Sequence, residues 1–144
     1  MNGSISVSRV ADQRGQLRFH RICLSLGIGL SLAIVWLSLT PRPIDLDLGA
    51  NSDKLEHLTA YGSLMFWFCM VYPVARRQYL LAPGFCAMGV GIEFLQGMTS
   101  YRTFEWADMV ANCAGVAVGW CIGRTPLVGL LASLEKLISR YGEV

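Results

Sequence analysis

Long apolar runs constrain the fold of this chain more than any other feature. Residues 22–39 carry no charged side chain. A helix of that length, at about 1.5 Å rise per residue, spans roughly 27 Å, enough to cross the hydrocarbon core of a bilayer. Three more apolar runs follow at about residues 55–74, 79–96 and 106–122. The sequence therefore predicts an all-α membrane protein in which four transmembrane helices form a compact bundle.

Composition agrees with this fold class and excludes others. Of the 144 residues, 53% are hydrophobic and only 15% are charged, whereas globular domains carry about 25% charged residues. The formal net charge of +2 is too small to indicate a nucleic-acid partner. The five cysteines all lie within apolar runs and form no CxxC pair. That pattern is typical of small buried hydrophobic side chains and not of a disulfide or zinc framework.

The basic residues set the expected orientation of the chain. Nine of the twelve Lys and Arg residues lie before residue 22, between residues 74 and 79, or after residue 122. The other side carries three basic residues and seven of the ten acidic residues. Because cytoplasmic segments of membrane proteins carry the excess of Lys and Arg, we expect a multi-pass protein of the cell (inner or plasma) membrane with both termini in the cytoplasm.

The segment after the last apolar run has a different pattern. Leu127, Leu130, Leu131 and Leu134 recur at i, i+3 and i+4 spacing, and Pro126 suits a first helical turn. This pattern predicts an amphipathic interfacial helix that lies on the inner membrane surface or packs on the bundle. The chain thus divides into a basic cytoplasmic tail, a membrane domain and a cytoplasmic amphipathic tail, at residues 1–21, 22–123 and 124–144.

Polar side chains collect at the expected outer ends of three of the spans. Ionisable groups are costly to bury in hydrocarbon, so those found inside a membrane protein are candidates for a function. The start of the second span carries Asp53, His57 and Tyr61, and the end of the third carries Glu93 and Gln96. The start of the fourth carries Asp108 and Asn112, and the loop between the third and fourth carries Arg102. We expect these groups to line a small cleft that opens to the outside.

One face of the fourth span continues from polar residues into glycines. Asp108, Asn112, Gly115 and Gly119 follow one another at spacings of 4, 3 and 4 residues, which places them along one helix face. Glycines at GxxxG spacing let a neighbouring helix approach closely. We therefore expect this face to point into the bundle and predict structural roles for Gly115 and Gly119.

The residue types indicate which chemistry the polar cluster could support. Glu93, Asp108 and His57 are candidate catalytic residues because carboxylates and imidazoles act as acids and bases. No cofactor is certain from the sequence, but a divalent metal could be bound, and its ligands would then be these same three residues. The Arg102 guanidinium would suit a phosphate or carboxylate. It is one of five candidate ligand-binding residues: Asp53, Tyr61, Gln96, Arg102 and Asn112.

Each of these residues also has a simpler structural interpretation. The whole role of His57 could be to pair with Asp53. The polar groups of the fourth span could cap a helix or hold helices together, and each such interhelical hydrogen bond stabilises the fold by about 0.6 kcal/mol. Three further charged residues are interpreted as a solvated loop charge or as interface anchors: Glu105, Lys54 and Glu56.

Three motifs of the chain resemble the VanZ-like family of small integral membrane proteins. They are DKLEHLTAYGSL from residue 53, GIEFLQGMTSYR from residue 91 and WADMVANCAGVAVG from residue 106. The resemblance covers about residues 22–123. The family takes its name from an accessory protein of glycopeptide-resistance clusters that is associated with teicoplanin resistance. The resemblance implies a four-helix membrane fold and a role in the cell envelope, and it assigns no reaction.

Three functions fit these observations. The first is a bacterial-type membrane protein that, besides membrane lipids, binds or modifies an amphipathic or lipid-linked molecule of the cell envelope. The second is a proton- or ion-coupled transporter, for which four spans without an inverted repeat are few. The third is a structural membrane partner whose polar cluster only fixes helix packing. The sequence leaves open whether the chain is an enzyme and whether it forms oligomers.

Overall fold

Every regular element that the structure describes is a helix. The computed structural model describes residues 19–41 and 52–141. The elements are α2 (His20–Ser38), α3 (Ser52–Val71), α4 (Ala75–Gly97), α5 (Trp106–Ile122), the 3-10 helix η1 (Pro126–Gly129) and α6 (Leu130–Tyr141). The predicted all-α class is confirmed. Most of the predicted N-terminal tail and the segment 42–51 lie outside the described residues.

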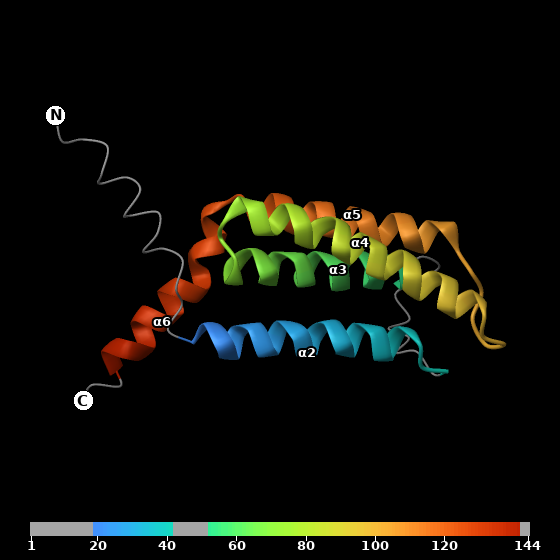
Figure 1. Ribbon diagram of the computed structural model, residues 1–144, viewed down its shortest axis with the longest axis horizontal. Coiled ribbons are helices and arrows are strands. Elements are labelled where there is room, and N and C mark those ends of the chain that lie inside the picture. Colours follow the sequence, from blue (N-terminus) through green and yellow to red (C-terminus); the bar gives the residue numbers. More distant parts are fainter. Residues whose placement is uncertain (1–18, 42–51, 142–144) are drawn as a thin grey trace.

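Helices α2 to α5 run alongside one another, and α6 turns away at one end (Figure 1). Helix α3 contacts α2, α4 and α5, so it holds the other three together. Its buried side chains meet those of its neighbours, for example Phe68 and Phe85, whose ring centroids are 5.2 Å apart. Trp67 of α3 also donates a hydrogen bond of 3.0 Å from Nε1 to the Cys23 carbonyl of α2. The core therefore surrounds α3.

The predicted span boundaries agree with the helices at some ends and not at others. The span predicted at 106–122 coincides with α5. The prediction that the second span reaches residue 74 is wrong, because α3 ends at Val71 and Pro73 has no N–H with which to continue a helix. The third helix begins at Ala75 and not at 79, so Arg76 and Arg77 belong to its first turn.

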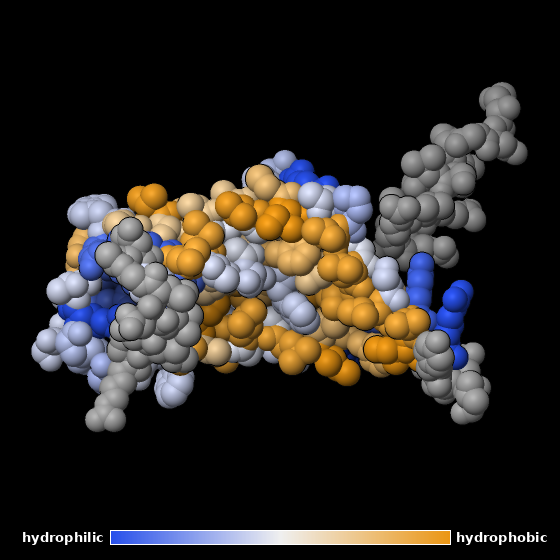
Figure 2. Space-filling view, turned by 180° about the vertical axis from the view of Figure 1, so that it is seen from behind, coloured by the Kyte–Doolittle hydropathy of each residue, from blue (hydrophilic) through white to orange (hydrophobic). Residues whose placement is uncertain are grey.

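The surface of the helices is of the membrane type. Trp36 of α2 and Leu80 of α4 are 69% and 72% exposed, and exposure of this kind over a whole face is unfavourable in water. Hydrophobic residues cover the middle of the molecule, and hydrophilic residues gather toward its ends (Figure 2). Such a band matches a bilayer with its two headgroup layers.

Length and hydropathy identify fewer spans than the four predicted. Helices α2 and α4 are each long and apolar enough to cross a membrane, and α5 with the helix beyond its 76° bend would provide a third span. Helix α3 does not meet the same test, and its first turns carry charged side chains. The number of spans, the compact bundle within the membrane and the orientation of the termini stay predictions.

The predicted tail helix is present, and a 76° bend separates it and η1 from α5. Leu130, Leu134, Leu137 and Ile138 are all exposed on it, so its apolar face is not packed against the described part of the chain. Its Glu135 carboxylate accepts a hydrogen bond of 2.9 Å from the Phe19 amide, which ties α6 to the start of α2. Its location on the inner membrane surface stays a prediction.

Candidate functional site

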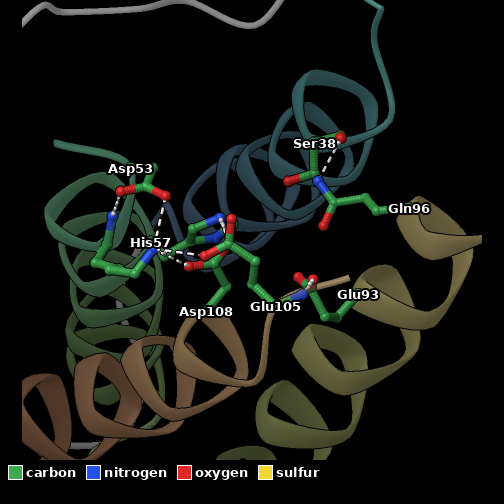
Figure 3. Close-up of polar contacts among 8 residues, drawn as sticks. Ser38, Asp53, His57, Glu93, Gln96, Glu105 and Asp108 are labelled. Carbon is green, nitrogen blue, oxygen red and sulfur yellow. Dashed lines mark hydrogen bonds and ion pairs between the residues drawn. The ribbon is translucent and has the colours of Figure 1, made fainter. Parts of the chain in front are cut away.

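The ammonium group of Lys54 is the centre of the charged cluster. Its Nζ atom lies 2.8 Å from Asp53 Oδ2, 2.9 Å from Glu105 Oε2 and 3.2 Å from Asp108 Oδ1. Figure 3 labels these three acidic residues. Lys54 and Asp53 belong to the first turn of α3, whereas Glu105 is the N-cap residue of α5 and Asp108 lies in the first turn of α5. The cluster therefore joins the N-terminal ends of two helices, where the helix dipole favours carboxylates.

Two earlier interpretations are corrected by this geometry. Lys54 is not an interface anchor, because its side chain is only 29% exposed and points at three carboxylates. Glu105 is more than a solvated loop charge, because its side chain, 44% exposed, also forms an ion pair with Lys54. Both errors have the same origin: the pairing depends on how α5 is rotated against α3, and a one-dimensional pattern does not contain that rotation.

The ion pairs stabilise the charged forms of the groups that precede the second apolar run. The hydrogen bond from Lys54 holds the pKa of the Asp53 carboxyl below its ordinary value. The hydrogen bonds to Asp53 and then to Glu105 raise the pKa of Lys54 above its ordinary value. Asp53 and Lys54 are therefore a charged pair at neutral pH.

His57 contacts Asp108 and not Asp53. Its Nε2 atom lies 3.6 Å from Asp108 Oδ2, and both side chains are mostly buried, at 16% and 11% exposure. Helical spacing places His57 and Asp53 on the same face of α3, but the Asp53 carboxylate pairs with the adjacent Lys54. Imidazole and carboxylate are thus neighbours at slightly more than hydrogen-bond distance, and a small shift of either would allow a proton to pass between them.

Glu93 reaches the same cluster from α4. It is 1% exposed, and its Oε1 atom accepts a hydrogen bond of 2.6 Å from the Glu105 amide. Its Oε2 atom has no hydrogen-bond partner within the described residues. Electrostatic contacts connect its carboxylate with Asp108, His57 and Glu105. The three candidate catalytic residues, Glu93, Asp108 and His57, are therefore brought together at one end of the molecule.

The five predicted ligand-binding residues have different surroundings in the structure. Gln96 uses its amide to donate a hydrogen bond of 2.8 Å to the Ser38 carbonyl, and so fastens the end of α2 to α4. Tyr61 and Asn112 are each 1% exposed, and the Tyr61 hydroxyl and Asn112 Oδ1 lack partners within the described residues. Arg102 is partly buried, and its Nε atom likewise has no partner among them. Only Asp53 of the five joins the ion-pair network.

Two glycines bring α5 close enough to α3 to form the cluster. A Cβ atom added to Gly115 would meet the Leu58 carbonyl, and one added to Gly119 would meet the Gly62 carbonyl. A Cβ on Gly89 of α4 would come within 2.9 Å of Asn112 on α5. These contacts leave no room for side chains, so the backbone positions that carry Asp108 and Lys54 are fixed by close helix packing.

A comparison with protein families identifies the chain. Residues 28–128 match the VanZ/LLP1 family, a match that covers more than half of the chain. The chain belongs to the VanZ/LLP1 family. The predicted family is thereby confirmed. An uncharacterized protein of Schizosaccharomyces pombe is 29% identical over 126 residues, which cover 84% of this chain and 73% of the yeast protein. No solved structure matches the chain significantly.

The region matched to VanZ/LLP1 contains the whole described cluster, from Asp53 to Asp108. It also contains the two charged residues that sequence reasoning left out of the site. A signal for Lys54 was present, because it lies within the DKLEH motif beside Asp53. A signal for Glu105 was its position three residues before Asp108, on the same end of the same helix.

Proposed function

We propose that this VanZ/LLP1 protein binds, and could chemically modify, an amphipathic or lipid-linked molecule of the cell envelope at the Lys54 cluster. The observation that carries the proposal is that α3, α4 and α5 bring charged groups to one end of the molecule, and that two of these groups, from α4 and α5, are buried. Asp108 and Glu93 are 8% and 1% exposed. Buried charges are costly even when paired, so their convergence favours a use beyond helix packing.

The surroundings of the cluster support an amphipathic ligand in particular. Trp106, Met98 and Val110 are 70%, 84% and 67% exposed, and they lie on the ends of α4 and α5 that border the cluster. A ligand with a polar head and an apolar tail would place the head at the carboxylates and the tail along these side chains. We expect it to approach from the outer leaflet through the predicted cleft.

The proposed roles follow from the contacts. Asp108 and His57, with Nε2 and Oδ2 3.6 Å apart, would form the acid–base pair if the ligand is modified. Glu93 would hold the α4–α5 segment through the Glu105 amide. Arg102 would bind a phosphate or carboxylate of the ligand.

A structural function is the second candidate, and specific contacts favour it. The Gln96 bond to the Ser38 carbonyl and the Glu93 bond to the Glu105 amide both join elements that would otherwise separate. A protein that only scaffolds membrane partners would need such contacts. It would not depend on the charge of Asp108 or Glu93, because amides of the same shape also hydrogen-bond.

The experiment therefore removes charge and keeps shape. The parent protein, Glu93→Gln and Asp108→Asn would be extracted with their native lipids into polymer nanodiscs, and the bound molecules identified by mass spectrometry. We expect both variants to accumulate and melt like the parent, to lose the bound envelope molecule and to fail to complement a deletion strain under envelope stress. Glu56→Gln, an acid of α3 without a described partner in the cluster, is the matched control.

Well-folded amide variants that retain the same bound molecules and complement fully would contradict the proposal. The structural function would then be the better account of the cluster.

A further inference from the structure

We infer that Asp53, Glu105 and Asp108 form a site for one divalent cation, in which the Lys54 ammonium occupies the position of the metal in this structure. The inference rests on the proposed function, because the cation would prepare the cluster for a phosphate-bearing headgroup. It also replaces the predicted metal ligands, since His57 and Glu93 are not among the three ligands.

The geometry of the oxygen atoms carries the first step. One carboxylate oxygen from each of Asp53, Glu105 and Asp108 lies within 4.8 Å of the other two. All three residues contact the single Nζ atom of Lys54, at 2.8, 2.9 and 3.2 Å. Calcium takes oxygen ligands at about 2.3–2.6 Å and magnesium at about 2.0–2.1 Å. These metal–oxygen distances are shorter than the distances from Nζ to the three oxygens. Because the Asp53 and Glu105 side chains are half-exposed, they can move inward to close the gap.

The charge of the cluster carries the second step. Three carboxylates face one ammonium, which leaves two negative charges that Lys54 does not neutralise. Uncompensated charges of one sign repel one another, most strongly at the mostly buried Asp108 carboxylate. A divalent cation in place of the ammonium would leave one negative charge instead of two, and carboxylate oxygens are the ligands that calcium and magnesium prefer.

A fourth carboxylate gives independent support. Glu93 is 1% exposed, its Oε1 atom accepts a hydrogen bond from the Glu105 amide, and its Oε2 atom has no partner within the described residues. Figure 3 shows its side chain extending from α4 toward the segment that carries Glu105. A buried carboxylate oxygen without a donor among the described residues, near Glu105 and Asp108, would be stabilised by a further positive charge.

His57 has a supporting place in such a site. Its Nε2 atom faces Asp108 Oδ2, whereas the Oδ1 atom of the same carboxylate faces Lys54. An imidazole on the outer oxygen of a metal-binding carboxylate orients that carboxylate. We therefore assign His57 as a positioning residue for Asp108.

The cation would change which headgroup the protein can accept. The cluster without a metal is anionic and repels a phosphate. Magnesium sites in proteins commonly use one or two carboxylates and complete their shell with water and the phosphates of the bound molecule. A divalent cation at the cluster would thus bridge the protein to a phosphate-bearing lipid.

Metal binding is tested on the full-length protein in detergent, washed with a chelator and without added lipid. Manganese is titrated with detection by electron paramagnetic resonance, and magnesium and calcium by their effect on the melting temperature. We expect about one manganese ion per chain. Glu105→Gln and Asp108→Asn should weaken binding at least tenfold, because each removes a charged ligand, whereas Glu56→Gln should leave binding unchanged.

A further variant makes the proposal sharper. Lys54→Gln removes the ammonium that competes for the three oxygens, so it should bind manganese several-fold more tightly than the parent. If Asp108→Asn does not fold, Glu105→Gln provides the same test at a more exposed position. The inference is overturned if the parent shows no saturable binding, if Glu56→Gln loses binding as Glu105→Gln does, or if Lys54→Gln weakens binding.

The two proposals fail separately. A parent that binds no metal, yet loses its lipid-linked molecule in Asp108→Asn, would keep the proposed function and lose the cation site. A parent that binds manganese but carries the same lipids as every variant would keep the cation site and lose the proposed function.

Discussion

The two ends of the molecule use their charged residues in different ways. At the α6 end, the guanidinium of Arg124 lies 4.7 Å from the ring centre of Trp120, and that of Arg77 lies 4.7 Å from the ring of Tyr72. Both arginines are exposed. At the other end, Asp108 is 8% exposed and Glu93 is 1% exposed, and the charges face one another. One end places charge on aromatic rings at the surface, and the other buries it.

The difference indicates what each end is adapted to do. Arginines stacked on tryptophan and tyrosine are sufficient to place a helix end at a membrane interface. The buried polar group at the α6 end, Gln78, is satisfied: its amide donates to the Tyr72 carbonyl at 2.9 Å and accepts from Trp120 at 3.3 Å. Nδ1 of His20 is a buried atom without a partner at the α6 end, among the described residues, whereas the Lys54 end keeps an unpartnered carboxylate oxygen, Glu93 Oε2. An interface anchor does not need such a carboxylate.

The largest expected difference between the ends is their side of the membrane. We predict that Ser100→Cys, near the Lys54 cluster, reacts fully with an impermeant thiol reagent applied to intact cells, and that Ala75→Cys reacts only after the cells are opened. Both positions are exposed. Gln78, in the same basic stretch as Ala75, is a poor reporter because it is buried and hydrogen-bonded.

Both variants are made in a cysteine-free background, because Cys121 is exposed near the end of α5 and would itself react. Labelling of Ala75→Cys but not of Ser100→Cys on intact cells would reverse the orientation. The Lys54 cluster would then face the cytoplasm, and the ligand would have to come from the inner leaflet.

The second prediction breaks the packing on which the Lys54 end depends. Gly119→Leu should prevent accumulation of folded protein. Overpacking a core with extra carbon atoms costs about 1–3 kcal/mol, and here the new side chain meets the Gly62 carbonyl of α3, which cannot rotate away. Detergent size-exclusion profiles and melting curves give the result.

Gly91→Leu is the matched control, since a Cβ atom at Gly91 has nothing within 4 Å. If Gly119→Leu is as abundant and stable as Gly91→Leu, then the contact between α3 and α5 does not determine the fold. The comparison of the two ends would then lose its structural basis.

The sequence predicted the helices and much of the cluster, for physical reasons that can be named. Apolar run length predicts a helix because a membrane segment must satisfy its own backbone hydrogen bonds, and residues 106–122 form α5 as expected. Successive spans alternate in direction, so Glu93 at the end of one and Asp108 at the start of the next had to meet at one level. His57 follows from the same argument.

The partners within the cluster could not be predicted in the same way. Lys54 meets Glu105 across 51 positions of sequence, and that contact requires both the close approach at Gly115 and the rotation of α5. Gln96 meets the Ser38 carbonyl because α2 ends there, so a residue predicted to bind a ligand instead fastens a helix. Depth in the membrane can be inferred from a pattern, but the choice of partner at that depth cannot.

The smallest effects are expected from single charges at the α6 end. Arg124→Gln should lower the free energy of unfolding by only about 0.5–1 kcal/mol, because a cation at the surface over an aromatic ring contributes about that much. Lys54→Gln should cost about 1–2 kcal/mol in chelator-washed protein. That is less than the 3–5 kcal/mol for breaking a fully buried pair, since its partners are partly exposed to solvent.

Melting temperatures in one detergent, with and without manganese, compare the two variants directly. Manganese should restore the stability of Lys54→Gln, because the metal would replace the missing positive charge, and should leave Arg124→Gln unchanged. Equal losses for the two variants, with no response to manganese in either, would mean that both ends serve only as interface anchors.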